Sequence, residues 1–369
     1  MSSHCTETSM NNNSALENQV ITAKSNVQAQ NANVFIENRV IESAEFISQN
    51  SKHVKLGTDD EYKKAAIIVE DLAKKWRAES WSDFPLHPSE LSDPEKKAAY
   101  VFLIDTMNYA FWTEAGHKPY TVSYNGKPYT GYWSLCAAIK NAVLKDEKIL
   151  DAEFWANATV EDWGKIFTSE TETPCPFLEW RQKTISEAGR YLINNFEGST
   201  YKMIKSCNKS AVALAELVRS NLDSYKDQYE YHGRMVYFLK RAQIFAADLY
   251  FAFAADNNYV AEACAFTDIS KLTMFADYRV PQALNYLNLI HYDDYLMNEL
   301  KERPHFPPGS ELECEIRGCS IAAVEKLKKF ISYPKITSVL IDFVLWPYAK
   351  ENSELMAHIP IHQTRSVFY

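Results

Sequence analysis

Residues 273–282, TMFADYRVPQ, place an aspartate among aromatic side chains shortly before a proline. Pro281 suits the first turn of a helix, so Asp277 falls at or just before a predicted helix start. Two roles are open to Asp277: a cap that accepts backbone N–H groups, or a carboxylate aimed into a pocket where positive charge develops. The two roles are compatible, because backbone N–H groups that orient an aspartate also favour its ionised form.

The stretch LIDTMNYAFWTE carries a second group of polar and ring side chains. On a helix Asp105, Asn108 and Trp112 fall at positions i, i+3 and i+7 and share one face. The other residues are apolar, so we expect this segment to be buried on most sides, where an aspartate and an asparagine need hydrogen-bond partners. The spacing fits a structural polar network between helices and leaves a place in a pocket wall open.

The stretch FLKRAQIFAADLY places Lys240, Arg241 and Asp248 on one predicted helix. Two basic residues at a helix start oppose the helix dipole, which indicates contact with an anion such as a phosphate. The alternative is a first turn that is simply exposed to solvent.

Three further stretches hold candidate residues. EIRGCSIAAVEKL has Arg317 and Gly318 before a predicted helix, and LIDFVLWPYA places Asp342 and Trp346 four residues apart on one helix face. Either could form a buried ion pair with a ring packed beside it. His87 lies in a predicted loop between two prolines, where a lone histidine is usually a surface or turn residue.

Apolar periodicity predicts a mainly α fold. A hairpin interrupts the helices at YTVSYNGKPYTG, where Asn125-Gly126 is a type I′ turn signal. Residues 1–40 are rich in Asn, Ser, Gln and Thr and are predicted to be a disordered polar tail, followed by a single helical domain over 41–369. Helices are predicted over 59–76, 93–112, 132–144, 177–196, 210–222, 236–253, 281–301, 320–331 and 336–350.

Composition restricts the function. The 39 basic and 48 acidic residues give a net charge of −9, which argues against a duplex nucleic-acid binder. The seven cysteines show no CxxC pair or other metal-like spacing, and the odd count without a secretory leader indicates a cytoplasmic protein. No apolar stretch reaches the roughly 18 residues of a membrane span. We therefore expect a monomer that acts on a small molecule without a metal or cofactor.

Six stretches, read in order, resemble the signature stretches of the queuosine salvage protein family: IDTMNYAFWTE, GKPYTGYWSLCAAI, FLKRAQIFAADLY, DISKLTMFADYRVPQAL, EIRGCSI and HQTRSVFY. The resemblance extends from about residue 40 to residue 369. It implies a helical bundle akin to the helix-hairpin-helix DNA glycosylases. It also implies a hydrolase that releases queuine from queuosine 5′-phosphate for reuse in tRNA. Asp277 and Lys240 are then similar to the catalytic aspartate and the hairpin lysine of those enzymes.

The resemblance also implies the ligand contacts. Phe275, Asp342 and His87 occupy positions that contact the base, and Phe275 would stack on its flat ring. Lys240 and Arg279 are candidates for the 5′-phosphate. The other residues implied for the pocket are Asp105, Asn108, Trp112, Phe343 and Trp346.

This chain departs from the family pattern next to Trp346. Pro347 stands where some relatives carry an acidic residue, and Phe343 replaces a tyrosine, so polar contacts from this part of the pocket are in doubt. Two other functions stay open: a non-catalytic helical module that binds queuine, and a glycosylase that acts on a nucleic-acid polymer. The first would keep Phe275 and Asp342 without needing Asp277 and Lys240 together, and the negative net charge argues against the second.

Overall fold

The computed structural model describes residues 39–77, 83–114 and 116–369, and the predicted polar tail lies almost wholly outside these ranges. The described part is mainly helical, as the sequence predicts. It opens with a helix over residues 39–50. The other α-helices are α2 (Asp59–Lys75), α4 (Pro94–Thr106), α5 (Tyr132–Val143), α6 (Ala152–Asn157), α7 (Val160–Ile166), α8 (Leu178–Phe196), α9 (Thr200–Ser206), α10 (Ala211–Asn221), α11 (Lys240–Ala252), α12 (Tyr259–Cys264), α13 (Val280–Tyr286), α14 (Asp294–Glu302), α15 (Glu311–Leu327) and α16 (Ser338–Glu351).

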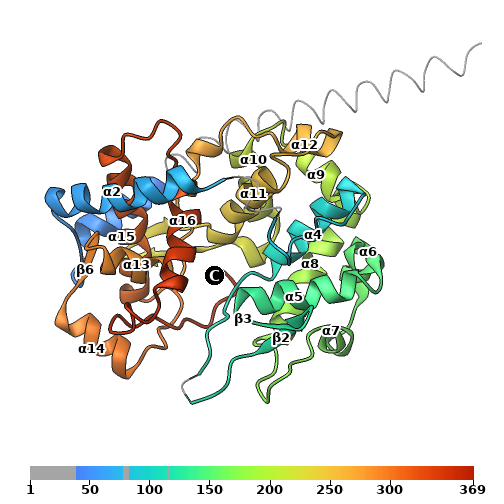
Figure 1. Cartoon of the computed structure of the whole chain (residues 1–369), viewed down its shortest axis with the longest axis horizontal. Helices are drawn as coiled ribbons and strands as arrows, with labels where there is room; N and C mark the ends of the chain where they lie inside the picture. Colours follow the sequence, from blue (N-terminus) through green and yellow to red (C-terminus); the bar gives the residue numbers. More distant parts are fainter. Residues whose placement is uncertain (1–38, 78–82, 115) are drawn as a thin grey trace, which may run out of the picture.

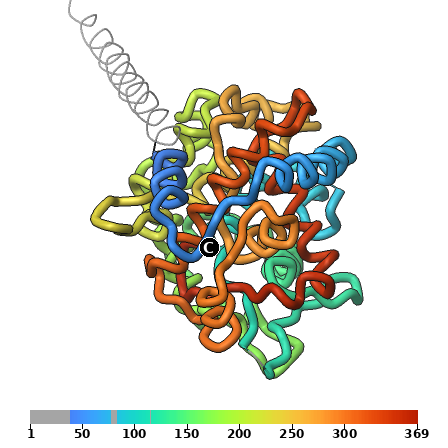
Figure 2. Tube along the Cα trace, turned by 90° about the vertical axis from the view of Figure 1, so that its left-hand side faces the viewer, coloured from blue at the N-terminus to red at the C-terminus, as the bar shows by residue number. Residues whose placement is uncertain are grey.

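The helices form two groups around α11. Figure 1 shows α2, α13, α15 and α16 on one side and α4 to α8 on the other, with the C-terminus near the centre. The first described helix and the chain after it pack against the last third of the sequence (Figure 2). Buried Glu315 of α15 fixes this contact, since it accepts hydrogen bonds from the Ser51 hydroxyl and the backbone of Lys52 and His53 at 2.7–2.8 Å.

Three antiparallel two-stranded sheets occur in the described ranges. The predicted hairpin is confirmed: β2 (Thr121–Tyr124) pairs with β3 (Lys127–Thr130), and Asn125 and Gly126 both have the positive φ of a type I′ turn. A second hairpin, β4 (Gln228–Tyr231) with β5 (Arg234–Tyr237), was not predicted. It also turns through two residues of positive φ, but these are His232 and Gly233, a weaker signal than Asn-Gly.

The predicted single helix over 281–301 is wrong. The chain leaves α13 at Tyr286, and Asn288 adopts a left-handed φ of 57°. Residues of β6 (Ile290–Tyr292) then pair with β1 (Val54–Leu56), more than 200 residues earlier, before α14 begins. This pairing is a tertiary interaction, which the local helical periodicity could not reveal.

Gly318 was predicted to precede a helix but lies in the middle of α15. A Cβ at this position would come within 2.6 Å of the Ile47 side chain, so glycine allows the 39–50 helix to pack directly against α15. The glycine therefore marks a close helix contact rather than a helix boundary. This packing belongs to one continuous apolar core that joins both groups of helices.

Candidate active site

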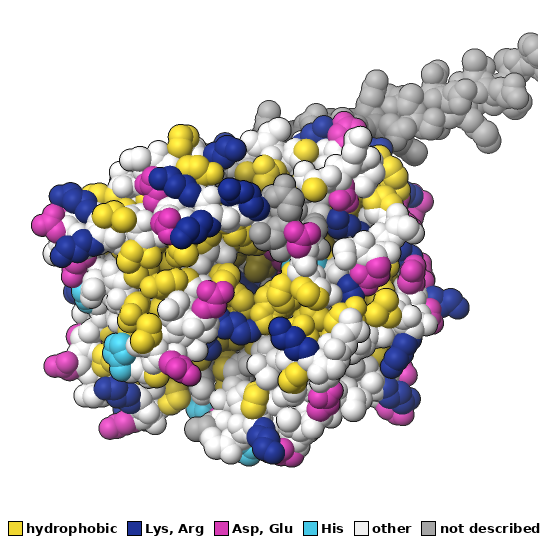
Figure 3. All heavy atoms as spheres, in the orientation of Figure 1, with side chains coloured by type: hydrophobic (Ala, Val, Ile, Leu, Met, Phe, Trp, Pro, Cys, Tyr) yellow, Lys and Arg dark blue, Asp and Glu magenta, His cyan; other side chains and the backbone are white. Residues whose placement is uncertain are grey.

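A cavity of about 770 Å³ lies between the two groups of helices. This volume suits a nucleotide-sized ligand. Figure 3 shows the hollow on one face of the molecule, rimmed by hydrophobic side chains with basic side chains close by. Its walls come from residues 108–113, the start of α5, one face of α11, residues 275–279, α16 and the last residue, Tyr369.

Asp277 lines this cavity and lies two residues before Arg279, the N-cap residue of α13. Its Oδ1 accepts the backbone N–H groups of Arg279 and Val280, each at 2.8 Å, and only 8% of the residue is exposed. Burial raises the pKa of Asp277 above the ordinary aspartate value, while Lys240 and the two backbone N–H groups oppose the shift. Asp277 is therefore not the N-cap residue itself, but its carboxylate binds backbone N–H groups at the start of α13 and also lines the pocket.

Lys240 is the first residue of α11 and lines the same cavity. Its Nζ donates to the backbone oxygen and the Oδ1 of Asn108, at 3.2 and 3.4 Å. Burial lowers the pKa of Lys240, and the negative charge of Asp277 is the largest influence that opposes the shift. A solvent-exposed first turn is thus excluded. The pair Asp277 and Lys240 places one negative and one positive charge in a buried wall.

Arg241 points away from the cavity, so the two basic residues at the start of α11 have different surroundings. The Arg241 guanidinium donates to the backbone oxygens of Asp105, Thr106 and Ser224. It also stacks on Tyr225, with 4.4 Å between the guanidinium carbon and the ring centroid. Arg241 therefore joins the end of α4 to α11.

The predicted helix through Asp105, Asn108 and Trp112 ends early, at Thr106. The N–H of Ala110, whose φ is 50°, donates to the backbone oxygen of Tyr369, so a contact with the end of the chain shapes this loop. Asn108 and Trp112 still line the cavity, from the loop. Asp105 lies behind the wall, fully buried.

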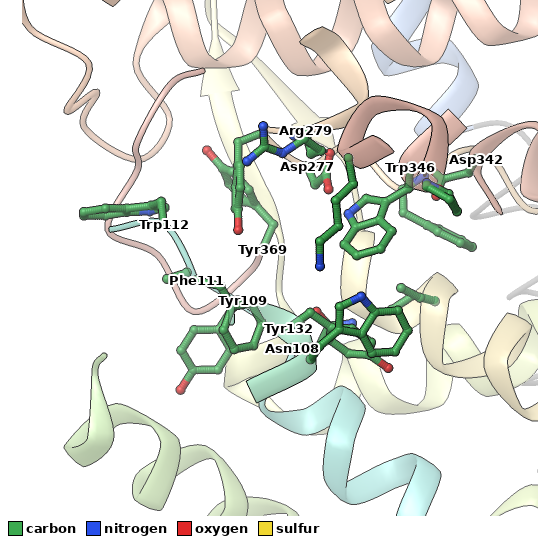
Figure 4. A pocket seen from close by; sticks show the side chains of 18 of the residues that line it. Asn108, Tyr109, Phe111, Trp112, Tyr132, Asp277, Arg279, Asp342, Trp346 and Tyr369 are labelled. Atoms are coloured by element: carbon green, nitrogen blue, oxygen red, sulfur yellow. Dashed lines mark hydrogen bonds between the residues drawn. The ribbon is translucent and has the colours of Figure 1, made fainter. Parts of the chain in front are cut away.

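The far end of the cavity is formed by α16 and by rings. Asp342 and Trp346, one turn apart on α16, both line it, as the spacing predicts, together with Phe343. The Oδ2 of Asp342 accepts the backbone N–H of Phe275 at 2.9 Å. Figure 4 shows Asp342 and Trp346 on the opposite side of the cavity from Phe111 and Trp112, with Asp277 and Arg279 between the two ends.

His87 is buried, not a surface residue, and it lines the cavity. Its ring lies 5.3 Å from Phe84 and 5.9 Å from Trp133, measured between ring centroids. The Nζ of Lys140 donates to the backbone oxygen of His87 and fixes the loop. All the residues predicted for the pocket except Asp105 therefore contribute to the cavity wall.

The sequence analysis missed much of the aromatic wall. These residues come from loops and from helix ends far apart in the chain, and the sequence carried no common signal for them. Tyr132, Trp133 and Tyr369 fall within stretches that resemble the family signatures, which was the only available hint. The missed lining residues include Trp76, Phe84, Tyr109, Phe111, Tyr132, Trp133, Tyr278, Lys350 and Tyr369.

A buried ionic cluster supports Asp277 and Lys240 from behind. Arg317 pairs with Asp227 at 2.7 Å and donates from Nε to the backbone oxygen of Ala276 at 2.9 Å. Asp227 in turn accepts the backbone N–H of Lys240 at 3.0 Å. Arg317 thus fixes the backbone next to Asp277, and Asp227 fixes the backbone of Lys240.

The described residues hold no group of three or more His, Cys, Asp or Glu side chains placed to bind a metal ion. Within the same ranges, no helix has both the length and the apolar character needed to cross a membrane. The fold and the site together define a helical protein with a nucleotide-sized cavity that is lined by aromatic side chains and a buried carboxylate.

The chain belongs to the queuosine salvage protein family, whose profile matches residues 86–369. A Mus musculus protein named queuosine 5′-phosphate N-glycosylase/hydrolase is 37% identical over 89% of this chain and 98% of its own length. A Nematostella vectensis protein of the same name is 37% identical over 89% of this chain and 97% of its own length. A Bos taurus protein of that name is 35% identical over 89% of this chain and 98% of its own length.

Proposed function

We propose that this chain hydrolyses the N-glycosidic bond of queuosine 5′-phosphate, releasing queuine and ribose 5-phosphate so that queuine can be reused in tRNA modification. The full-length similarity to proteins named for this activity supports the proposal. The observation that carries it is the position of Asp277, a carboxylate fixed by two backbone N–H groups in the wall of a nucleotide-sized cavity.

The proposed reaction follows from the chemistry of the bond. Breaking the bond between ribose C1′ and the base nitrogen builds oxocarbenium character on the sugar, which a fixed carboxylate stabilises. Queuine carries carbon in place of purine N7, so the usual protonation site on the leaving base is absent. The stabilisation of the sugar cation by Asp277 therefore carries more of the catalysis than it would for an ordinary purine.

The cavity walls suggest how the substrate lies. The base would contact Phe275, Asp342 and His87 at the far end, between rings that include Trp346. Phe275 and Phe343 meet with 6.2 Å between ring centroids at 77°, so they form an edge-to-face corner against which a flat base can pack. With Asp277 between the two ends, the sugar lies over Asp277 and the phosphate beyond it.

Lys240 and Arg279 are the proposed contacts for the 5′-phosphate. Both line the cavity, and Figure 4 shows Arg279 next to Asp277. Arg279 is half-buried and is oriented by Gln282, whose Oε1 accepts from an Arg279 guanidinium nitrogen at 2.9 Å. Two cations beside one anion give this part of the wall a net positive charge, so it can bind the negatively charged phosphate.

The phosphate assignment is testable with two substrates. In the Lys240→Ala variant we expect kcat/KM to fall further for queuosine 5′-phosphate than for queuosine, by about tenfold or more, because a charged hydrogen bond is lost only with the phosphate. Equal losses on both substrates would show that Lys240 acts on Asp277 and the sugar and does not bind the phosphate. The Arg279→Gln variant, measured with the same two substrates, shows whether Arg279 also binds the phosphate.

The alternative functions make different predictions. A polymer-acting glycosylase would bind through phosphates and show a steep salt dependence, which the net charge of −9 disfavours. A non-catalytic queuine-binding module has no need for the buried pair of Asp277 and Lys240. We further propose a cytoplasmic monomer without metal or cofactor. Six buried cysteines in the described ranges, all as free thiols, suit a reducing compartment.

The direct experiment is incubation of the purified chain with queuosine 5′-phosphate and detection of the products by mass. We expect free queuine and ribose 5-phosphate in equal amounts, formed without added metal and in the presence of a chelator. Binding of the substrate without any product would instead favour the non-catalytic module.

A further inference from the structure

A buried arginine of α8 holds the backbone that follows α4. The Arg181 guanidinium donates to the backbone oxygens of Met107 and Tyr109, the latter at 2.8 Å, and Arg181 is fully buried. Its Nε donates to the backbone oxygen of Pro176 at 2.9 Å, which ties the guanidinium to the chain just before α8. A planar guanidinium can bridge several oxygens in a fixed geometry, whereas a lysine ammonium donates from a single point.

Asn108 lies in the chain between the two residues that Arg181 bridges, and it binds the Lys240 ammonium. The Nζ of Lys240 donates to the backbone oxygen and to the Oδ1 of Asn108, at 3.2 and 3.4 Å. A lysine side chain is a flexible stem, so these two hydrogen bonds fix where its ammonium lies. The position of this positive charge in the cavity wall therefore depends on the backbone that carries Asn108.

The same part of α8 also supports rings of the cavity wall. The guanidinium carbon of Arg181 lies 4.6 Å from the ring centroid of Tyr109 and 4.7 Å from that of Phe111. Phe177, which precedes the first residue of α8, contacts Trp112 with 6.0 Å between the ring centroids. Since all three wall rings line the cavity, Arg181 fixes side chains as well as the backbone of this wall.

Resting on the proposed function, we infer that Arg181 is a positioning residue: it holds the backbone on both sides of Asn108 and so places the Lys240 ammonium for the substrate. Arg181 is buried behind the wall and does not line the cavity, so it acts through Asn108 and not on the substrate itself. Arg241 has a different task, because it donates to the backbone oxygens of Asp105 and Thr106 at the end of α4.

A double-mutant cycle with Lys240→Ala separates positioning from a merely structural role. Arg181→Lys keeps the positive charge but cannot bridge the two backbone oxygens. We expect it to lower kcat/KM for queuosine 5′-phosphate about tenfold in the original protein but less than about threefold in the Lys240→Ala variant, because Arg181 acts through Lys240. A merely structural role would give the same loss in both backgrounds, since independent effects add. Equal losses, or no loss in the original protein, would overturn the inference.

Two further variants and a binding measurement complete the test. Arg190→Lys is the matched control, because Arg190 lies on the exposed side of α8 and donates to the backbone oxygen of Ala156 at 3.4 Å, so kcat/KM should change less than about twofold. Arg181→Gln buries no charge and replaces Arg181→Lys in the cycle if that variant does not fold. The same cycle, measured as calorimetric binding of queuosine 5′-phosphate, needs no turnover, so equal losses of affinity in both backgrounds would also overturn the inference. A protein that shows the coupling in binding yet releases no queuine would refute the proposed function instead.

Discussion

Two buried ionic clusters lie next to each other in this protein, and their hydrogen bonding differs. Around Arg317 the charged groups are joined by hydrogen bonds: the guanidinium pairs with both Asp227 and Glu313 and packs between the rings of Phe238 and Tyr369, 4.1 and 4.0 Å from their centroids. Within the described residues, Lys240 instead donates its side-chain hydrogen bonds to Asn108, and Asp277, Asp105 and Asp342 act on it through their charge alone.

The difference indicates which cluster serves structure and which serves a ligand. A buried charge that has all its partners fixes the backbone and leaves nothing for a substrate. The second cluster opens to the cavity and has carboxyl groups whose pKa burial raises, which is typical of functional sites. The Arg317 cluster therefore supplies the rigidity that the cavity cluster lacks.

We expect the largest effect from a substitution in the cluster that lines the cavity. Asp277→Asn should lower kcat by about three orders of magnitude, because an amide cannot stabilise a sugar cation as a carboxylate does. The amide oxygen can still accept the N–H groups of Arg279 and Val280, so thermal unfolding and substrate affinity should be preserved. Turnover within about tenfold of the original protein would remove Asp277 from the catalytic role.

Arg317→Met should act on stability instead. It leaves Asp227 and Glu313 buried without their partner, which typically costs about 3–5 kcal/mol of unfolding free energy. Urea unfolding measures this loss, with Arg303→Met as the control, because Arg303 pairs with Glu299 at an exposed site where about 1 kcal/mol or less is expected. Similar losses in the two variants would contradict the contrast between the clusters.

The pH dependence of kcat tests the cavity cluster. Burial raises the pKa of Asp277, and the reaction needs its ionised form, so kcat should fall with decreasing pH at values above the ordinary aspartate pKa of about 4. Saturating substrate is required, because the substrate phosphate itself titrates near about pH 6. An activity that stays constant down to about pH 4 would show that the cavity does not perturb this carboxylate.

A smaller effect is expected at the cavity mouth. Burial lowers the pKa of Lys350 to about 8, with Arg279 contributing by repulsion. Its Nζ lies over the rings of Trp133 and Trp346, 5.6 and 5.4 Å from their centroids. We expect KM for the anionic substrate to rise severalfold, roughly two- to fivefold, in Lys350→Gln and in the original protein above about pH 8. A pH-dependent rise that persists in the variant would assign it to another group.

Local sequence signals predicted some of the site. Pro281 and the residues before it indicated the helix start that positions Asp277, and the four-residue spacing placed Asp342 and Trp346 together on α16. Both features depend on interactions within one helix turn, which is why a short stretch of sequence reveals them.

The remaining features depend on contacts between distant segments. The end of α4 follows from the bond between Ala110 and Tyr369, and α13 is separated from α14 by the pairing of β6 with β1. The spacing within TMNYAFW could not reveal a loop shaped by the end of the chain.

The most direct test of the account is a crystal structure of the Asp277→Asn variant with uncleaved queuosine 5′-phosphate. We predict that ribose C1′ lies about 3–3.5 Å from the side-chain oxygen at position 277, with the base between Phe275 and α16. A substrate bound with its anomeric carbon far from position 277, or outside this cavity, would contradict the account.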